Sequence, residues 1–316
     1  MLYIIHRGNY ELTNRLFSEI KTPVIYITTD ELSIYKNKFV KIASIILSFL
    51  GISLNFNISK ELKKELKKIK TEDSVLFWDF YTIPLILSAA KYCKCKKKSL
   101  WLWNTFPRRK TKLLSLKFLK KKLEIYTFDE QDALLFKINL KNQICYNIQK
   151  YKENIEYNKG VELNDLYFIG VDKGRYAKLV DLYDFFMMKK LSCDFTIIRD
   201  KLSVFIDDTR FSNQTLSFDE NIKHIFSSKC LIELVKENQT GLTMRALEAF
   251  LADKKLVTNN KYIMKQPFYK KENIFVLGVD NSDQIVDFIN SEYLKVDSID
   301  KSDYLINNWI LDFYEE

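Results

Sequence analysis

Residues 229–260 read KCLIELVKENQTGLTMRALEAFLADKKLVTNN. Two short apolar runs, 230–234 and 255–258, flank a longer amphipathic segment, 242–252. Short β-branched and aliphatic runs are typical of buried strands, whereas apolar residues at helical spacing over a longer segment predict a helix. A strand, a helix and a second strand in close succession form a βαβ unit, whose strands are parallel. This stretch therefore predicts an α/β fold with a parallel sheet.

The same alternation continues through the rest of the chain. Strands are predicted at 2–5, 24–27, 74–78, 99–103, 124–127, 166–169, 194–198, 230–234, 255–258 and 274–277. Helices are predicted at 10–20, 33–51, 60–69, 83–92, 113–121, 129–136, 175–190, 242–252 and 282–289. Repeated βα units of this kind favour sheets covered by helices on both faces.

A polar, irregular stretch at 140–164 interrupts this alternation and suggests a boundary between domains. We expect an N-terminal domain at 1–150, a linker at 151–163 and a C-terminal domain at 164–295. The tail, 296–316, carries an amphipathic helix that we expect to return to the N-terminal domain. The predicted fold class is thus α/β, with two separate α/β domains.

Composition excludes several classes of protein. With 316 residues, 47% of them apolar and 14% aromatic, the chain is not a disordered or low-complexity polymer. It has only two histidines, His6 and His224, so a multi-histidine metal centre is excluded and no metal ligands are predicted. Seven glycines leave little room for glycine-rich phosphate loops. The longest apolar stretch, 42–56, is too short to span a bilayer.

Charge differs between the two halves of the chain. Residues 1–150 hold 28 Lys and Arg against 13 Asp and Glu, a net charge of +15, whereas residues 151–316 carry −6. A basic first half indicates an anionic partner: a membrane surface, an anionic acceptor or nucleic acid. A Lys-rich proteome would raise the lysine content of both halves, so it explains the difference only in part.

Polar side chains follow several predicted strands of the second domain. Lys173, Gly174 and Arg175 come after strand 166–169, Arg199 comes after strand 194–198, and Asn259 follows strand 255–258. In open α/β sheets, ligands bind outside the carboxyl ends of the strands. We therefore expect a binding site at this edge, although a Lys-Gly turn, an Arg-Asp turn and an Asn pair are also ordinary turn formers.

The segment from Gln239 to Glu248 carries the sharpest functional pattern. If a helix begins at Thr240 or Gly241, then Gly241, Arg245 and Glu248 lie on one of its faces. The N-terminus of such a helix offers free N–H groups to a phosphate, and a carboxylate two turns further on suits a ribose. The alternative is that Arg245 and Glu248 form a structural ion pair.

These motifs resemble a known family. FIGVDKGRYAKLVDL, CDFTIIRD, the 230–260 stretch and FYKKENIFVLG resemble the donor domain of bacterial GT-B-fold glycosyltransferases of surface-polysaccharide and lipopolysaccharide synthesis. The shared pattern is a glutamine-x-glycine-leucine-threonine-x-arginine-x-x-glutamate-alanine helix. SVLFWDF, LWLWN and EIYTFDEQDA resemble the same family's acceptor domain more weakly.

The resemblance implies two Rossmann-like domains facing a cleft (GT-B architecture) and transfer of a sugar from a nucleotide diphosphate donor, without a metal or other cofactor. UDP is the first nucleotide that we expect. By analogy, Glu248 would bind the donor ribose, while Lys173 and Arg175 would neutralise the leaving diphosphate. The implied donor set also includes Gly174, Arg199, Gln239, Thr240, Gly241, Leu242, Thr243, Arg245 and Asn259. Larger retaining GT-B families place two glutamates eight residues apart, but Thr240 occupies the upstream position here, so retention or inversion stays open.

A base for the acceptor, if the reaction needs one, should come from the first domain. Asp79 follows strand 74–78 directly, and His6 follows strand 2–5. The ordinary pKa of histidine suits proton transfer near neutral pH. A helix-capping aspartate and a structural histidine are the alternatives.

Two basic amphipathic stretches, 58–70 and 108–122, favour attachment to anionic lipid, with an ordinary solvated helix face as the alternative for each. We expect a glycan or lipid-linked glycan acceptor, such as a lipopolysaccharide or capsule precursor, and peripheral attachment of a cytoplasmic protein to the inner face of the membrane. Two alternatives stay open: a GT-B-fold epimerase acting on nucleotide sugars, and a non-enzymatic protein that binds nucleic acid or an anionic surface. No nucleic-acid partner is expected, because no recognition module is present.

Overall fold

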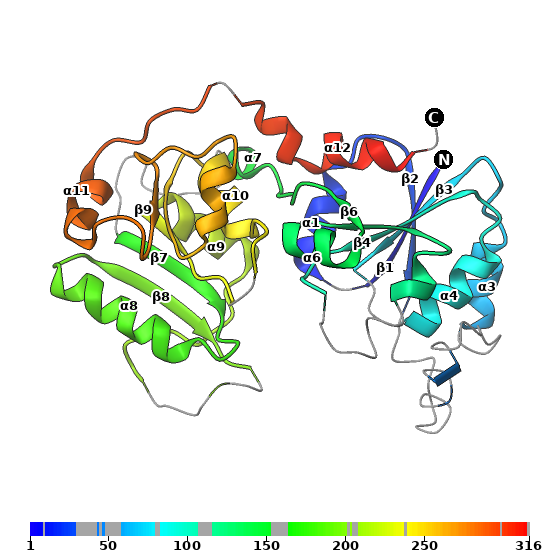
Figure 1. Cartoon of the computed structure of the whole chain (residues 1–316), viewed down its shortest axis with the longest axis horizontal. Coiled ribbons are helices and arrows are strands. Elements are labelled where there is room, and N and C mark those ends of the chain that lie inside the picture. Colours follow the sequence, from blue (N-terminus) through cyan, green and yellow to red (C-terminus); the bar gives the residue numbers. More distant parts are fainter. Residues whose placement is uncertain are drawn as a thin grey trace. The chain divides into compact units, whose positions relative to one another are not determined.

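The computed structural model describes residues 1–8, 10–29, 43, 46–47, 58–79, 83–106, 116–152, 164–200, 203, 208–236, 239–297 and 299–314. The chain divides into two compact units (Figure 1). Unit 1 comprises Met1–Gln143 and Tyr304–Glu316, and unit 2 comprises Ile144–Asp303. The C-terminal segment therefore returns to unit 1, as the sequence predicts.

Unit 1 is built on a six-stranded parallel sheet in the order β2-β1-β3-β4-β5-β6. Its strands are β1 (Leu2–Arg7), β2 (Val24–Thr29), β3 (Ser74–Trp78), β4 (Lys97–Leu102), β5 (Glu124–Thr127) and β6 (Asn139–Leu140). Its helices include α1 (Glu11–Ser18), α3 (Lys60–Leu66), α4 (Ile83–Tyr92), α6 (Glu130–Phe136) and α12 (Ile306–Trp309), the last followed by the 3-10 turn η5 (Ile310–Phe313).

The two faces of the unit 1 sheet are covered differently. On one face, the side chains of Ile5, Phe77 and Leu100 pack into a core cluster with α3 and α4. On the other face lie tryptophans, and the Trp309 ring of α12 packs against the rings of Trp78 and Trp101, with centroids 5.7 and 4.9 Å away. The C-terminal segment thus completes this core.

Unit 2 is built on a five-stranded parallel sheet in the order β11-β10-β9-β7-β8. Its strands are β7 (Asn164–Val171), β8 (Cys193–Ile198), β9 (Ser228–Glu233), β10 (Lys255–Thr258) and β11 (Ile274–Val276). Its helices include α7 (Ile148–Lys152), α8 (Tyr176–Met188), α9 (Phe218–Phe226), α10 (Met244–Leu251) and α11 (Ile285–Asn290), and shorter 3-10 turns are η2 (Lys261–Lys265), η3 (Ser282–Gln284) and η4 (Lys301–Tyr304).

Side chains alternate across the unit 2 sheet. Phe168 and Ile232 belong to a core cluster that includes residues of α8 and α11, on one face. Tyr167 points to the opposite face, where it stacks on His224 of α9 with ring centroids 5.2 Å apart. Helices α9 and α10 both pack on strands of this sheet, and α8 lies along β8 (Figure 1). Two parallel sheets with helices on both faces confirm the predicted α/β class.

All ten predicted strands are present, within a few residues of their expected bounds. The sequence analysis missed β6 and helices α7 and α9. Asp129 is the N-cap of α6, since its side chain accepts the N–H of Asp132. Most of predicted helix 33–51, of the apolar stretch 42–56 and of the predicted linker 151–163 lies outside the described residues.

The apolar stripe of the first basic stretch is buried within unit 1. Leu62 and Leu66 of α3 are 7% and 0% exposed, and Ile58 and Ile69 join the same core cluster. This helix therefore has the ordinary solvated-face arrangement, in which its lysines, and not its leucines, meet water. Within the described residues, no helix has the length and apolarity required to cross a bilayer.

Candidate functional site

Each sheet has one topological switch point, a strand whose two neighbours in the sheet are reached by chain connections that run in opposite directions. In unit 2, β7 lies between β8 and β9, and in unit 1, β1 lies between β2 and β3. Ligands of open α/β sheets bind outside the carboxyl ends of the strands at such a point. The two places to search are therefore the residues after β7 and β9 in unit 2, and those after β1 and β3 in unit 1.

The turn after β7 carries an unusual backbone conformation. Lys173 has φ +52° and Gly174 has φ +76°, both in the left-handed region. Glycine adopts this region at little cost, but a residue with a side chain pays of order 1–3 kcal/mol. The buried Asp172 secures the turn, because its Oδ1 accepts the N–H of Arg175 at 2.8 Å. Strain held in this way at a switch point indicates a functional turn.

Three cations gather around the unit 2 switch point. Lys173 and Arg175 follow β7, and Lys236 lies in the loop after β9. The pKa of Lys173 is lowered first by desolvation and then by the positive charges of Lys236 and Arg175, whereas the negative charge of Asp200 opposes this shift. The side chain of Lys173 nevertheless reaches the surface. Like charges held together repel one another, so an anion bound among them would be stabilised.

Arg175 contributes to this cluster mainly by its charge, because three of its N–H groups already donate to main-chain carbonyls. Its Nε donates to the carbonyl of Asp172 at 3.1 Å, its Nη2 donates to the carbonyl of Val171 at 2.6 Å, and its Nη1 donates to the carbonyl of Leu234. Burial lowers the pKa of this guanidinium. The expected direct contact of Arg175 with a diphosphate is thus replaced by bonds that tie the end of β7 to the residue after β9.

The described residues between β9 and α10, 234–236 and 239–243, which we call the β9–α10 loop, are held by two asparagines that follow β10. Asn259 accepts the N–H of Val235 at 2.7 Å and donates to its carbonyl at 3.2 Å. Asn260 donates to the carbonyls of Thr240 and Gly241 at 3.4 and 3.3 Å. Asn259 therefore lies at the predicted edge, but its amide holds the loop.

The helix expected to begin at Thr240 or Gly241 begins later. Helix α10 starts at Met244, and Thr243 is its N-cap, whose hydroxyl oxygen accepts the N–H of Ala246. Threonine is a favoured N-cap, which explains the later start. The prediction that Gly241 shares a helical face with Arg245 and Glu248 is therefore wrong.

The hydroxyl of Thr243 also has a different partner from the one expected. It donates to Oε1 of Glu233, the last residue of β9, at 2.5 Å. Because Glu233 is 3% exposed, a buried carboxyl group stands beside the first turn of α10. Burial raises the pKa of Glu233, and its carboxyl group stands beside the start of α10, close to where the sequence predicts a phosphate.

Arg245 and Glu248 form a buried ion pair. Nη1 of Arg245 lies 2.9 Å from Oε2 of Glu248, and their side chains are 13% and 6% exposed. Tyr146 donates its hydroxyl hydrogen to the other oxygen of Glu248, and the Arg245 guanidinium lies 5.3 Å from the ring centre of Tyr167. Of the two interpretations open in the sequence, the structure forms the ion pair, with the carboxylate directed into unit 2.

The other expected donor residues divide between surface and interior. Arg199 is exposed after β8, and Gln239 is half-buried with its N–H donated to the carbonyl of Lys236 at 3.2 Å. Leu242 is 6% exposed, so its side chain packs inside. The sequence analysis missed Lys236, Glu233 and Asn260, although each stands directly after, or at the end of, a predicted strand.

The two base candidates lie near the carboxyl ends of neighbouring strands at the switch point of unit 1. His6 lies at the end of β1, and Asp79 follows its neighbour β3 directly. His6 is 6% exposed, with Nδ1 2.8 Å from the carbonyl of Arg7 and Nε2 3.4 Å from the hydroxyl of Thr28. A carbonyl only accepts, so Nδ1 carries the hydrogen and Nε2 is left as an acceptor. Burial lowers the pKa of His6, which keeps the ring neutral at neutral pH.

Asp79 resembles Lys173 in its backbone. Its φ is +53°, and its N–H donates to the carbonyl of Trp101 at 3.0 Å. Among the described residues, five other than glycine have positive φ, and the remaining three follow helices α6, α8 and α10. The two that follow strands stand at the two switch points.

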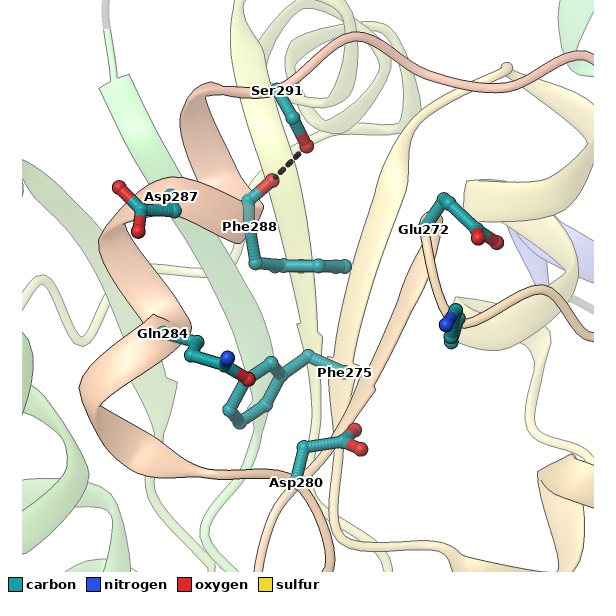
Figure 2. Close-up of a pocket in the computed structure, with 8 residues that line it drawn as sticks. Glu272, Phe275, Asp280, Gln284, Asp287, Phe288 and Ser291 are labelled. Atoms are coloured by element: carbon teal, nitrogen blue, oxygen red, sulfur yellow. Dashed lines mark hydrogen bonds between the residues drawn. The ribbon is translucent and has the colours of Figure 1, made fainter.

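A pocket of about 390 Å³ lies elsewhere in unit 2, along edge strand β11 (Figure 2). The rings of Phe275 and Phe288 form its apolar wall, Asp287 points away from it, and Glu272 and Asp280 stand at its rim (Figure 2). None of the predicted site residues lines it. Three carboxylates, Glu272, Asp280 and Asp287, and one lysine, Lys271, line the pocket, so its net negative charge is unfavourable for a diphosphate. The described residues also contain no cluster of three or more acidic, histidine or cysteine side chains suited to a metal ion.

Solved structures with similar folds were found by comparison. The UDP-forming alpha,alpha-trehalose-phosphate synthase of Burkholderia xenovorans, in complex with glucose-6-phosphate, is 10% identical with a TM-score of 0.59, over 99% of this chain and 98% of that one. The trehalose-6-phosphate structure from E. coli, bound with UDP-2-fluoro glucose, is 11% identical with a TM-score of 0.58, over 100% and 99%. The Burkholderia vietnamiensis enzyme of the same name as the first is 11% identical with a TM-score of 0.56, over 92% of both chains.

The chain has the GT-B fold. At these sequence identities the likeness concerns the fold, and it confirms the architecture of two Rossmann-like domains expected from the sequence. No protein-family model matches the chain, and no curated protein matches its sequence. The surface-polysaccharide type is thus not established by the comparisons, and neither is a particular acceptor.

Proposed function

We propose that the protein is a glycosyltransferase that moves a sugar from a nucleotide diphosphate sugar to a saccharide acceptor. The observation that carries the proposal is the cluster of Lys173, Arg175 and Lys236 at the switch point of the unit 2 sheet. When the bond between the sugar and the diphosphate of the donor breaks, negative charge grows on the diphosphate. Fixed cations at that place stabilise the transition state more than the ground state.

The residues have distinct roles in this proposal. The flexible ammonium groups of Lys173 and Lys236 contact the diphosphate, and Arg175 adds the field of its buried charge while it holds the two strand ends. Glu248 is given no contact with the ribose, because Tyr146 and Arg245 bind its two oxygens. UDP is the first nucleotide to test, since one structure of the same fold is bound with UDP-2-fluoro glucose.

Unit 1 supplies the acceptor site in this proposal. Its switch point holds His6, whose Nε2 is an acceptor in a neutral ring and can take a proton from a sugar hydroxyl. Asp79 stands after the neighbouring strand and can bind or orient that hydroxyl. A sugar acceptor is consistent with a structure of the same fold that holds glucose-6-phosphate.

The finer assignment is synthesis of a bacterial surface glycan, such as lipopolysaccharide or capsule, with a glycan or lipid-linked glycan as acceptor. Its support is the resemblance of the 230–260 stretch to transferases of that type. The net charge of +15 in residues 1–150 supports contact of this half with the anionic inner face of the cytoplasmic membrane. The burial of Leu62 and Leu66 makes any such attachment electrostatic.

The experiment measures release of UDP from a panel of UDP-sugars, with and without saccharide acceptors, for the wild type and for Lys173→Ala and Lys236→Ala. Each substitution is expected to lower kcat/KM at least tenfold, while the thermal midpoint changes little because both side chains are exposed. Lys261→Ala, an exposed lysine of η2, serves as the matched control. Full activity in both variants would contradict the assignment of the site. Conversion of the donor sugar to its epimer in the absence of an acceptor would favour the alternative function, a nucleotide-sugar epimerase.

A further inference from the structure

Glu233 is a buried carboxyl group that the proposed reaction leaves without a role. It ends β9, one residue before Leu234, and its residue is 3% exposed. Its side chain lies on the α10 side of the sheet, where its Oε1 accepts from Thr243 of the β9–α10 loop. Burial of a carboxyl group costs free energy unless its oxygens are hydrogen-bonded.

Both oxygens of Glu233 are hydrogen-bonded. Thr243 donates to Oε1 at 2.5 Å, and Thr258, the last residue of β10, donates to Oε2. Thr258 is also the partner of Glu233 in the register of β9 and β10. Both threonines act as donors, so both hydroxyl hydrogens point towards Glu233.

The orientation of these hydroxyls determines which main-chain groups of the loop they can bind. With its hydrogen on Glu233, the Thr258 oxygen accepts the N–H of Asn260 at 2.9 Å. Asn260 in turn donates to the carbonyls of Thr240 and Gly241. The Thr243 oxygen likewise accepts the N–H of Ala246, which fixes the first turn of α10.

We propose that Glu233 is a positioning residue, whose carboxyl orients the Thr243 and Thr258 hydroxyls and thereby fixes the β9–α10 loop that carries Lys236. The proposal rests on the proposed function of the unit 2 switch point. Glu233 does not touch the donor, and it acts through two threonines and Asn260. The donor class it serves is a nucleoside diphosphate sugar, whose diphosphate needs Lys236 in a defined place beside Lys173.

The test compares four variants and one control. Glu233→Gln keeps the side-chain shape but replaces one acceptor oxygen by a donor, and Thr258→Val removes one of the two hydroxyls. Thr258→Ser restores that hydroxyl, and Glu233→Ala removes the whole carboxyl. Thr196→Val, in a buried threonine of β8 away from the loop, controls for the loss of a buried hydroxyl as such.

Two quantities are measured in each protein: the affinity for UDP by calorimetry, and the rate of amide hydrogen exchange at 239–243 in the free protein. Glu233→Gln and Thr258→Val are expected to weaken UDP binding about tenfold and to speed exchange of the loop, whereas Thr258→Ser restores both. Thr196→Val is expected to lower the thermal midpoint about as much as Thr258→Val without changing UDP affinity.

The outcomes separate the two proposals. Wild-type affinity in Glu233→Gln and Thr258→Val, with tight UDP binding by the wild type, overturns the role of Glu233 and leaves the proposed function standing. Absence of UDP binding and of inorganic diphosphate binding by the wild type overturns the proposed function, and the role of Glu233 with it. A loss of affinity that is equal in Thr196→Val and Thr258→Val also overturns the role, because it shows a general loss of stability.

Discussion

The guanidinium of Arg175 donates to the main-chain carbonyl of Leu234, so one side chain joins the ends of β7 and β9. Two further carbonyls, those of Val171 and Asp172, accept from the same group. A cation whose donors are bound to carbonyls keeps its charge, because carbonyls carry none. The switch point of unit 2 thus has a positive charge held in place by the backbone of the strands that define it.

Arg175→Met is expected to lower both stability and donor affinity. The substitution removes three hydrogen bonds from a charged donor, which together contribute about 3 kcal/mol. For a unit of this size the thermal midpoint should fall by about 9 °C. Scanning calorimetry gives the midpoint, with Lys261→Met as the exposed control. A midpoint equal to that of the wild type would show that these bonds are not formed in solution.

Replacement of Tyr146 or Arg245 is expected to act on stability. Tyr146→Phe leaves one oxygen of the buried Glu248 without its donor and should cost about 2 kcal/mol in the free energy of unfolding. Arg245→Ala leaves the carboxylate without its counter-ion and should cost about 4 kcal/mol. Denaturant unfolding measures both values. If Glu248 instead bound the ribose, Glu248→Gln would weaken UDP binding at unchanged stability.

Protonation of His224 is expected to stabilise unit 2 at low pH. The hydrogen bond and the charge of Asp194 raise the pKa of His224 above 6.5 in the folded protein. A raised pKa contributes stability that is complete below the unfolded pKa of about 6.5, and this contribution is lost as the pH rises through the folded pKa. Asp194→Asn should therefore destabilise the protein more at pH 5.5 than at pH 9. Thermal midpoints at the two pH values check this, and an equal loss at both would contradict it.

Gly174→Ala is expected to be tolerated sterically but strained in the backbone. No atom lies within 4 Å of the position a Cβ would occupy, yet φ is +76°. The substitution should cost about 1 kcal/mol in stability and should move Lys173, with a several-fold loss of UDP affinity. Gly278→Ala, at φ +74° in open space after β11, is the matched control and should cost stability alone.

Much of the fold follows from local pattern. The strands of unit 2 are short apolar runs separated by polar turns, and this pattern is enough to predict buried strands from the sequence. Helix α9 was missed, although the sequence contains a signal for it. Ser217 and Glu220 form a capping box at the start of an amphipathic run. Strand β6 has only two residues and no pattern that a sequence could show.

The candidate site was harder to predict than the fold. The sequence placed Lys173 and Arg175 correctly at the edge, since position after a strand decides that. Thr243 is a favoured N-cap, so the later start of α10 has a local signal, but the sequence could not show that the same hydroxyl donates to Glu233, ten residues earlier in the chain. Nor could it show that Tyr146, about a hundred residues from Glu248, would occupy the carboxylate. Contacts distant in sequence decide which polar group is left for a ligand.

The central claim is that Lys173 and Lys236 receive the diphosphate of a nucleotide sugar. Calorimetric titration of UDP into the wild type and into the double variant Lys173→Ala/Lys236→Ala tests it most directly, at two salt concentrations. The account predicts binding by the wild type that weakens with salt, and a loss of at least a hundredfold in the double variant, which is about 2.7 kcal/mol. Equal affinity of the two proteins for UDP would contradict the account.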